Sequence, residues 1–216
     1  MSIAPVEHVF AHADAQARAL ADAVSARLRD GISARGGAWL AVPGGATPRK
    51  FLAVLARQTL DWPRVTATLT DERLVPADDP RSNERMLREV LMAPTQARFA
   101  PLQSEVSRPF DAVVLGMGTD GHCASLFADG DNIAAALRAD AAESVLTMHS
   151  PSVPEARVTL TLSALVDTRA LFVLIRGAEK RRTLESALSG KGPFAQAPIR
   201  AVLEHSQVAP QVYWCP

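Results

Sequence analysis

The chain has 216 residues, of which 48% are hydrophobic and 21% charged, a composition that is ordinary for a globular domain with one sizeable core. Its 23 basic and 23 acidic residues cancel, so no net field favours nucleic acid or an acidic membrane surface. Cys123 and Cys215 form no Cys-x-x-Cys pair, and no apolar run approaches the roughly 18 residues of a membrane span. We therefore expect one domain over residues 1–216, located in the cytoplasm, that binds neither nucleic acid nor a membrane.

The first part of the chain predicts a helix followed by a strand-loop-helix unit. Asp14 can cap a helix whose apolar residues recur at 3.6 spacing as far as Leu28, and Gly31 is expected to end it. A buried strand, Ala38 to Val42, follows. The next helix is predicted from Pro48 to Arg57, with proline at its first position, where a missing N–H costs nothing.

The loop between that strand and helix contains Gly44, Gly45 and Thr47. A glycine loop that opens a helix can bind an anion, because free N–H groups and the helix dipole both face it. A tight turn without a ligand would leave the same pattern. No Gly-Lys-Ser/Thr sequence closes the loop, so it is not a Walker motif and ATP hydrolysis is disfavoured.

A second predicted strand, Val65 to Thr70, runs directly into Asp71, Glu72 and Arg73. Three charged residues at the end of an apolar strand are costly to bury unless they are paired or bind a ligand, although a solvated charge run gives the same sequence. Ser82 is a good N-cap for a helix over Asn83 to Met92. The intervening loop is expected to lie over the same sheet edge as the glycine loop.

The most informative stretch is Phe110 to Ala128, in which a buried strand (Ala112 to Leu115) leads to three glycines and then to Asp120 and His122. Ligands of open parallel sheets bind outside the carboxyl ends of the strands, so these two side chains are expected at a functional site. The spacing Gly-x-Gly-x-x-Gly predicts a tight strand-to-helix turn. A dinucleotide site would use the same spacing, but Asp140 precedes the next strand, whereas that motif wants its acidic residue at the strand's far end.

Further strands are predicted at 145–149, 158–162, 171–175 and 211–214, with helices at 179–188 and just before the last strand. Strands that alternate with helices at this spacing predict an α/β fold with a doubly wound, mostly parallel sheet and helices on both faces, a Rossmann-like arrangement of three layers.

Four segments together resemble the 6-phosphogluconolactonases that are related to glucosamine-6-phosphate deaminases. In chain order they are VPGGATP, TDERLVPADDPRSN, LGMGTDGHCASLF and IRGAEK, and the resemblance covers nearly the whole chain. Two positions depart from the family pattern. Ala46 stands where a serine is common in the glycine loop, which removes one hydroxyl donor, and Ala128 stands where a proline usually follows Leu-Phe.

The resemblance implies hydrolysis of 6-phospho-D-glucono-1,5-lactone to 6-phosphogluconate in the oxidative pentose phosphate pathway, without a cofactor or metal, by a monomer or weak homodimer. His122 would deprotonate the attacking water, an apt role because the unperturbed pKa of histidine lies near working pH. Asp120 would orient His122, and Arg73 would hold the substrate or the oxyanion. The remaining residues implied in substrate binding are Gly44, Gly45, Thr47, Asp71, Arg157 and Lys180.

Two alternatives remain at this point. In the deaminase relatives the Asp-Gly-His segment continues into Phe-Asn-Glu, whereas here Cys123 to Phe127 carry no carboxylate, which favours the lactonase. A sugar-phosphate-binding domain without catalysis would share the fold, but such regulators usually carry a DNA-binding module. The first helix here is alanine-rich and leads at once into the sheet.

Overall fold

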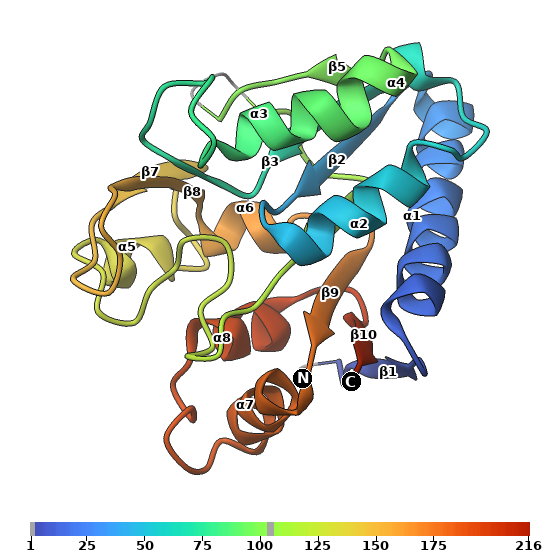
Figure 1. Ribbon diagram of the computed structural model, residues 1–216. Helices are drawn as coiled ribbons and strands as arrows, with labels where there is room; N and C mark the ends of the chain where they lie inside the picture. Colours follow the sequence, from blue (N-terminus) through green and yellow to red (C-terminus); the bar gives the residue numbers. More distant parts are fainter. Residues whose placement is uncertain (1–2, 103–105) are drawn as a thin grey trace.

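The computed structural model describes residues 3–102 and 106–216 and shows a seven-stranded parallel sheet between two layers of helices (Figure 1). The sheet order is β1-β10-β9-β6-β2-β3-β5, with bounds β1 Val6–Val9, β10 Gln211–Cys215, β9 Leu171–Arg176, β6 Ala112–Leu115, β2 Ala38–Val42, β3 Val65–Leu69 and β5 Arg98–Phe99. This confirms the predicted α/β, mostly parallel three-layer fold. β1 and β5 were not predicted, because β5 has two residues and β1 lies at an exposed edge.

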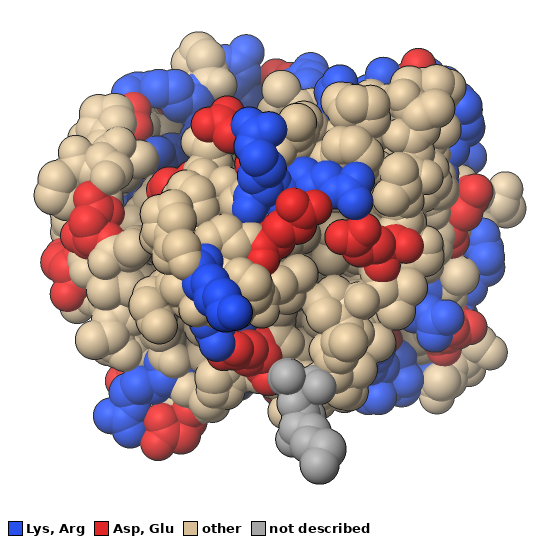
Figure 2. Space-filling view, turned by 90° about the horizontal axis from the view of Figure 1, so that it is seen from below, with Lys and Arg blue, Asp and Glu red and all other residues tan. Residues whose placement is uncertain are grey.

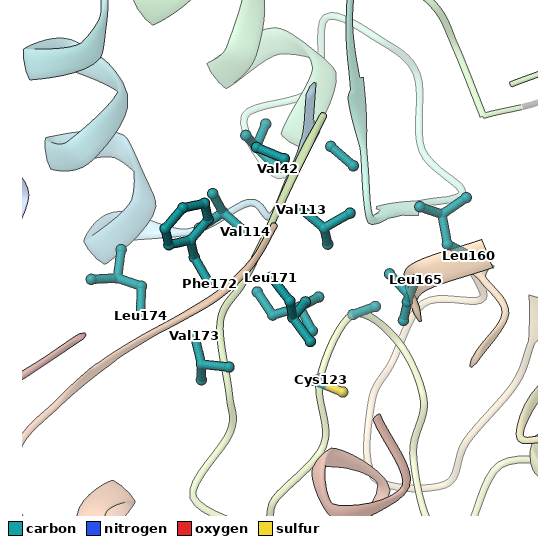
Figure 3. Close-up of a cluster of buried hydrophobic side chains, with 14 of the residues drawn as sticks. Val42, Val113, Val114, Cys123, Leu160, Leu165, Leu171, Phe172, Val173 and Leu174 are labelled. Carbon is teal, nitrogen blue, oxygen red and sulfur yellow. The ribbon is translucent and has the colours of Figure 1, made fainter. Parts of the chain in front are cut away.

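Helices α1 (Ala13–Arg35), α2 (Ala46–Leu55) and α3 (Asn83–Leu87) cover one face of the sheet, and α6 (Leu162–Val166), α7 (Ala178–Ser189) and α8 (Pro198–His205) cover the other (Figure 1). α3 continues through a π-helical segment, Arg88–Met92, into α4 (Ala93–Thr95), and a 3-10 turn, Trp62–Arg64, precedes β3. The central strands β6 and β9 are apolar on both faces because helices cover both. Figure 3 shows Val114 and Phe172 on one side of these strands and Val113 with Leu165 on the other.

A second sheet of three antiparallel strands lies beside the main one. It has the order β4-β8-β7, with bounds β4 Asp71–Arg73, β8 Arg157–Leu160 and β7 Val145–Met148, and the short helix α5 (Ile133–Ala136) precedes β7. The sequence predicted β7 and β8 nearly to the residue but not their separation from the main sheet. The predicted charged strand end, residues 71–73, is itself a strand here and pairs with β8.

The prediction that Gly31 ends the first helix is wrong. The helix continues to Arg35 and ends at Gly36, whose φ of 77° is left-handed. Gly31 is instead a packing position: a Cβ there would lie 2.7 Å from the Asp111 carboxylate, which accepts a hydrogen bond from the backbone N–H of Trp39. Its missing side chain lets α1 approach the buried carboxylate.

The order of the parallel strands reverses between β2 and β6. From β2 the chain proceeds outward to β3 and β5, and it then returns to β6 on the other side of β2 before reaching β9 and β10. Loops at the carboxyl ends of β2 and β6 therefore diverge and leave a crevice, where ligands bind in folds of this type. Both loops contain predicted site residues.

Candidate active site

A cavity of about 380 Å³ lies at this crevice. Its walls come from the loops after β2 and β6, from the second sheet and from the first turn of α7. All the predicted site residues except Asp120 line it: Gly44, Gly45, Thr47, Asp71, Arg73, His122, Arg157 and Lys180. The structure therefore brings together residues that lie up to 136 positions apart in the chain, from Gly44 to Lys180.

The glycine loop ends in the N-terminus of α2, which opens onto the cavity. The helix begins at Ala46, not at Pro48 as predicted, and Pro48 lies in the first turn, where an N–H would still lack a helical partner. Gly45 has a φ of 105°, and no side chain caps the helix. The free N–H groups of this first turn thus remain available to a ligand.

The side chain of Asn83 packs closely against the glycine loop at Gly44. A Cβ on Gly44 would lie 1.8 Å from Asn83 Oδ1, so only glycine permits this approach. The side-chain amide nitrogen of Asn83, Nδ2, donates to the backbone oxygen of Asp71 at 2.9 Å. Asn83 also lines the cavity. The sequence indicated it only as the first residue of a helix.

Asp71 and Glu72 point to opposite faces of β4, as the alternation of a strand requires. Asp71 is buried, lines the cavity and accepts hydrogen bonds from Ser125 Oγ at 2.6 Å and Thr70 Oγ1 at 3.1 Å. Glu72 turns away. It accepts from the backbone N–H groups of Asn83 and Glu84 at 2.8 and 2.7 Å, at the N-terminus of α3 that Ser82 caps, as predicted.

Arg73 and Arg157 are direct partners in the antiparallel pairing of β4 and β8. Arg73 donates to the backbone oxygen of Arg81, and Arg157 is only 7% exposed, with its Nε lacking a hydrogen-bond partner among the described residues. Burial first, and then the charge of Arg73, lower the pKa of Arg157. Glu155 Oε2 lies 3.7 Å from Arg157 Nη2 and offsets part of the repulsion between the two arginines, and an anion in the cavity would offset more of it.

The loop after β6 folds back on itself and does not lead into a helix, so the predicted strand-to-helix turn is wrong. Gly118 N–H donates to the backbone oxygen of His122 at 2.9 Å, and Gly121 N–H donates to that of Gly118 at 3.2 Å. A Cβ on Gly118 would lie 2.3 Å from Asp120 Oδ1 and from His122 Nδ1. The glycines serve to bring these two side chains together within a tight loop.

His122 Nδ1 lies 2.6 Å from Asp120 Oδ1. The hydrogen bond from His122 lowers the pKa of Asp120, so this carboxyl group is ionised and can only accept. Nδ1 therefore carries the proton, and in the neutral ring Nε2 holds the lone pair. Asp120 itself lies behind the ring, outside the cavity lining. Phe127 packs against the ring with 4.7 Å between centroids and lines the cavity.

Lys180 occupies the first turn of α7, whose N-cap is Gly177, and it lines the same cavity. Burial lowers the pKa of Lys180, and the negative charge of Asp120 opposes this effect. A half-buried ammonium group near the positive end of a helix is unfavourable on its own. An anion bound between the starts of α2 and α7 would reverse that cost.

Sequence reasoning missed Asn83, Ser125 and Phe127 as cavity residues. In the sequence each of the three looks like an ordinary core or cap residue. Its place in the cavity depends on a distant neighbour that only the fold brings close. Within residues 3–102 and 106–216 no group of three or more His, Cys, Asp or Glu side chains is arranged to hold a metal ion. No helix in the same ranges is long and apolar enough to cross a membrane. Figure 2 shows basic and acidic side chains interspersed on the face viewed from below.

Comparison with known proteins places this chain in a family. The model of the family described as glucosamine-6-phosphate isomerases/6-phosphogluconolactonase matches residues 11–108 and 96–214. A Rhizobium meliloti (strain 1021) protein named 6-phosphogluconolactonase is 41% identical over 97% of this chain and 98% of its own length. A Pseudomonas putida protein of the same name is 37% identical over 97% and 92%. The crystal structure of a 6-phosphogluconolactonase from Shewanella baltica OS155 superimposes with a TM-score of 0.91 at 33% identity, covering both chains completely.

Proposed function

Because this chain belongs to the glucosamine-6-phosphate isomerase/6-phosphogluconolactonase family, we propose that it hydrolyses 6-phospho-D-glucono-1,5-lactone to 6-phosphogluconate. One observation carries the proposal most directly. The His122 ring, with Nδ1 bound to Asp120, lines a cavity that also contains Arg73, Arg157 and Lys180. A base and several cations around one cavity suit a phosphorylated ester.

In the proposed reaction His122 Nε2 removes a proton from a water molecule as the water oxygen attacks the lactone carbonyl carbon. The carbonyl oxygen becomes an oxyanion, which Arg73 stabilises. When the tetrahedral intermediate collapses, the bond to the ring oxygen breaks and His122 returns the proton to that oxygen. The products are a carboxylic acid, which ionises, and a free hydroxyl group. Asp120 keeps the ring in the required tautomer, as an orienting carboxylate does in hydrolytic triads.

The phosphate would bind between the two helix N-termini. Gly44, Gly45 and Thr47 supply backbone N–H groups and a hydroxyl group at the start of α2, and Lys180 supplies an ammonium group from α7. Arg157 would contribute a second cation, and Asp71, held by Ser125, an acceptor for a sugar hydroxyl group. The absence of a hydroxyl at Ala46 leaves these groups unchanged.

Glucosamine-6-phosphate deamination is the alternative chemistry. It needs an acid, separate from the base, that protonates and opens the sugar ring. Asp71 is the carboxylate that lines the cavity among the described residues, but two hydroxyl groups already donate to it, and Glu72 is turned to the start of α3. Lactone hydrolysis therefore fits the cavity better than deamination. The pairing of His122 with Asp120 provides a base, which disfavours a domain that binds a sugar phosphate without catalysis.

The proposal places the enzyme in the oxidative pentose phosphate pathway of the cytoplasm, as a monomer or weak homodimer that needs no cofactor. The test is an assay of lactone hydrolysis with and without the 6-phosphate, corrected for the spontaneous reaction. We expect enzyme-dependent hydrolysis that is much faster for the phosphorylated lactone. Decay of both lactones at the rate seen in buffer would reject the function.

A further inference from the structure

Helix α7 contacts the site at two points one turn apart. Lys180 lines the cavity from its first turn, and Thr183, three residues later, is buried beneath the loop that carries Asp120 and His122. The hydroxyl group of Thr183 donates to the backbone oxygen of Thr119 at 2.8 Å. Thr119 directly precedes Asp120, so one helix touches both the proposed phosphate site and the loop of the proposed base.

The rest of this contact is close and specific. Gly121 lies against α7 and the start of α8: a Cβ there would be 2.5 Å from Ala197 Cβ and 3.5 Å from Thr183 Cγ2. The backbone N–H of Ile199, in the first turn of α8, donates to the Gly121 oxygen at 3.1 Å. The loop thus has its own internal turn and is held from outside by both helices.

α7 is a regular helix of 12 residues, in which residues three apart lie on the same side. A shift of Lys180 would therefore also move Thr183. The electrostatic environment connects the same two points, since the charge of Asp120 acts on Lys180. A phosphate group that binds Lys180 and the helix N-terminus would fix α7. Through Thr183 it would then fix the Thr119 carbonyl and the ring that Asp120 orients.

We propose that Thr183 is a positioning residue that couples phosphate binding at Lys180 to the placement of His122. The inference rests on the proposed function for its kinetic consequence, but the coupling itself is a property of the fold. It gives a physical route by which binding energy from a remote phosphate is used at the reacting carbonyl. Misplacing a catalytic group by about 1 Å can cost about 100-fold in rate, so the loss of this one hydrogen bond can lower the rate considerably.

The kinetic test uses Thr183→Val, which keeps the shape and removes the hydroxyl group, and Thr183→Ser, which restores it. The matched control is Ser186→Ala, one turn further along α7. Ser186 Oγ also donates to a backbone oxygen, that of Lys191 at 2.7 Å, but Ser186 does not line the cavity and Lys191 lies beyond the end of α7. Thermal unfolding of each variant establishes that it is folded.

We expect Thr183→Val to lower kcat for the phosphorylated lactone by roughly 10-fold to 100-fold with KM little changed. Hydrolysis of glucono-1,5-lactone, which has no phosphate, should change much less. Thr183→Ser and Ser186→Ala should behave like wild type. Combining Lys180→Ala with Thr183→Val should cost no more than Lys180→Ala alone, since the two act in series. Equal losses on both lactones, or additive losses, would overturn the coupling.

A second measurement does not depend on turnover. Inorganic phosphate is titrated into protein with ¹⁵N-labelled histidine, and the imidazole resonances of His122 are followed by NMR. In wild type and Ser186→Ala we expect phosphate to shift them, and in Thr183→Val to shift them much less at the same phosphate affinity. Equal shifts in Thr183→Val, or no phosphate binding to wild type, would overturn the inference. Coupled shifts in a wild-type protein that hydrolyses neither lactone would support the coupling and reject the proposed function.

Discussion

The Oγ atom of Ser125 lies 2.6 Å from Oδ2 of Asp71, which brings together a residue of the β6 loop and one of the second sheet. Ser125 also receives support from Thr159 of β8, whose hydroxyl oxygen accepts the Ser125 N–H at 3.1 Å. The two hydrogen bonds of Ser125 join the loop after β6, which carries His122, to the second sheet, which carries Arg73 and Arg157. Buried hydrogen bonds therefore help to set the distance between the base and the two arginines.

The proposed base is tested by His122→Ala. We expect a folded protein whose kcat falls about 100-fold to 10,000-fold, the usual range for removal of a general base. Asp120→Asn should lose less if the carboxylate only orients the ring. Steady-state kinetics with the phosphorylated lactone, together with circular dichroism, give both answers. A His122→Ala enzyme with near wild-type kcat would remove His122 from the mechanism.

The phosphate site is tested by Lys180→Ala. Since the ammonium group faces the proposed phosphate, its removal should raise KM and lower kcat for the phosphorylated lactone and leave the non-phosphorylated lactone nearly unaffected. Lys191→Ala, an exposed lysine just beyond α7, is the matched control and should match wild type. If Lys180→Ala slows both lactones equally, Lys180 is not a phosphate ligand.

The pH dependence of binding follows from burial of Lys180, which lowers its pKa below the ordinary 10.5. Phosphate favours the charged form, so affinity for 6-phosphogluconate should fall as the pH rises through this lowered pKa. In Lys180→Arg the charge persists above pH 12, and the affinity should stay flat over the same range. Calorimetric titrations from neutral pH to 10.5 measure this. The same alkaline decline in both proteins would assign the effect to another group.

The two enzymatic chemistries are separated by an ammonia assay with glucosamine 6-phosphate. We expect no enzyme-dependent release, because Asp71 is held by Ser125 and Thr70 and Glu72 is held at the start of α3. Lactone hydrolysis by the same preparation is the positive control. Ammonia release, with lactone decay no faster than in buffer, would establish the deaminase instead.

The packing of α1 is tested by Gly31→Ala. In an exposed helix alanine would gain up to about 1 kcal/mol over glycine. Here its Cβ would lie 2.7 Å from the Asp111 carboxylate, and overcrowding of this kind costs about 1 to 3 kcal/mol. We expect a lower free energy of unfolding in urea. Ser33→Ala, on the exposed side of the same helix, should be close to neutral or stabilising, and a stabilised Gly31→Ala would show that α1 can move away.

The amino-acid sequence alone predicts the parallel α/β fold and the charged residues that line the cavity. Strands such as Ala112–Leu115 are short apolar runs. Asp71 and Arg73 come just after the apolar run that ends at Thr70, and His122 lies in the glycine-rich segment after Leu115. Both signals are local, and parallel strands end at one edge of the sheet, so placing these residues near one another required only the fold class. Ser82 as the cap of α3 was local in the same sense.

Which distant residues these side chains contact depends on how the layers of the fold pack. Four close contacts join segments that are separated by tens of residues in the chain: Gly31 with Asp111, Gly44 with Asn83, Ser125 with Asp71, and Thr183 with Thr119. A glycine read alone predicts a turn, and a serine or threonine read alone predicts a cap or a surface. Their actual roles depend on steric and hydrogen-bonding partners that no local pattern encodes, because those partners come within reach only when the layers of the fold have packed.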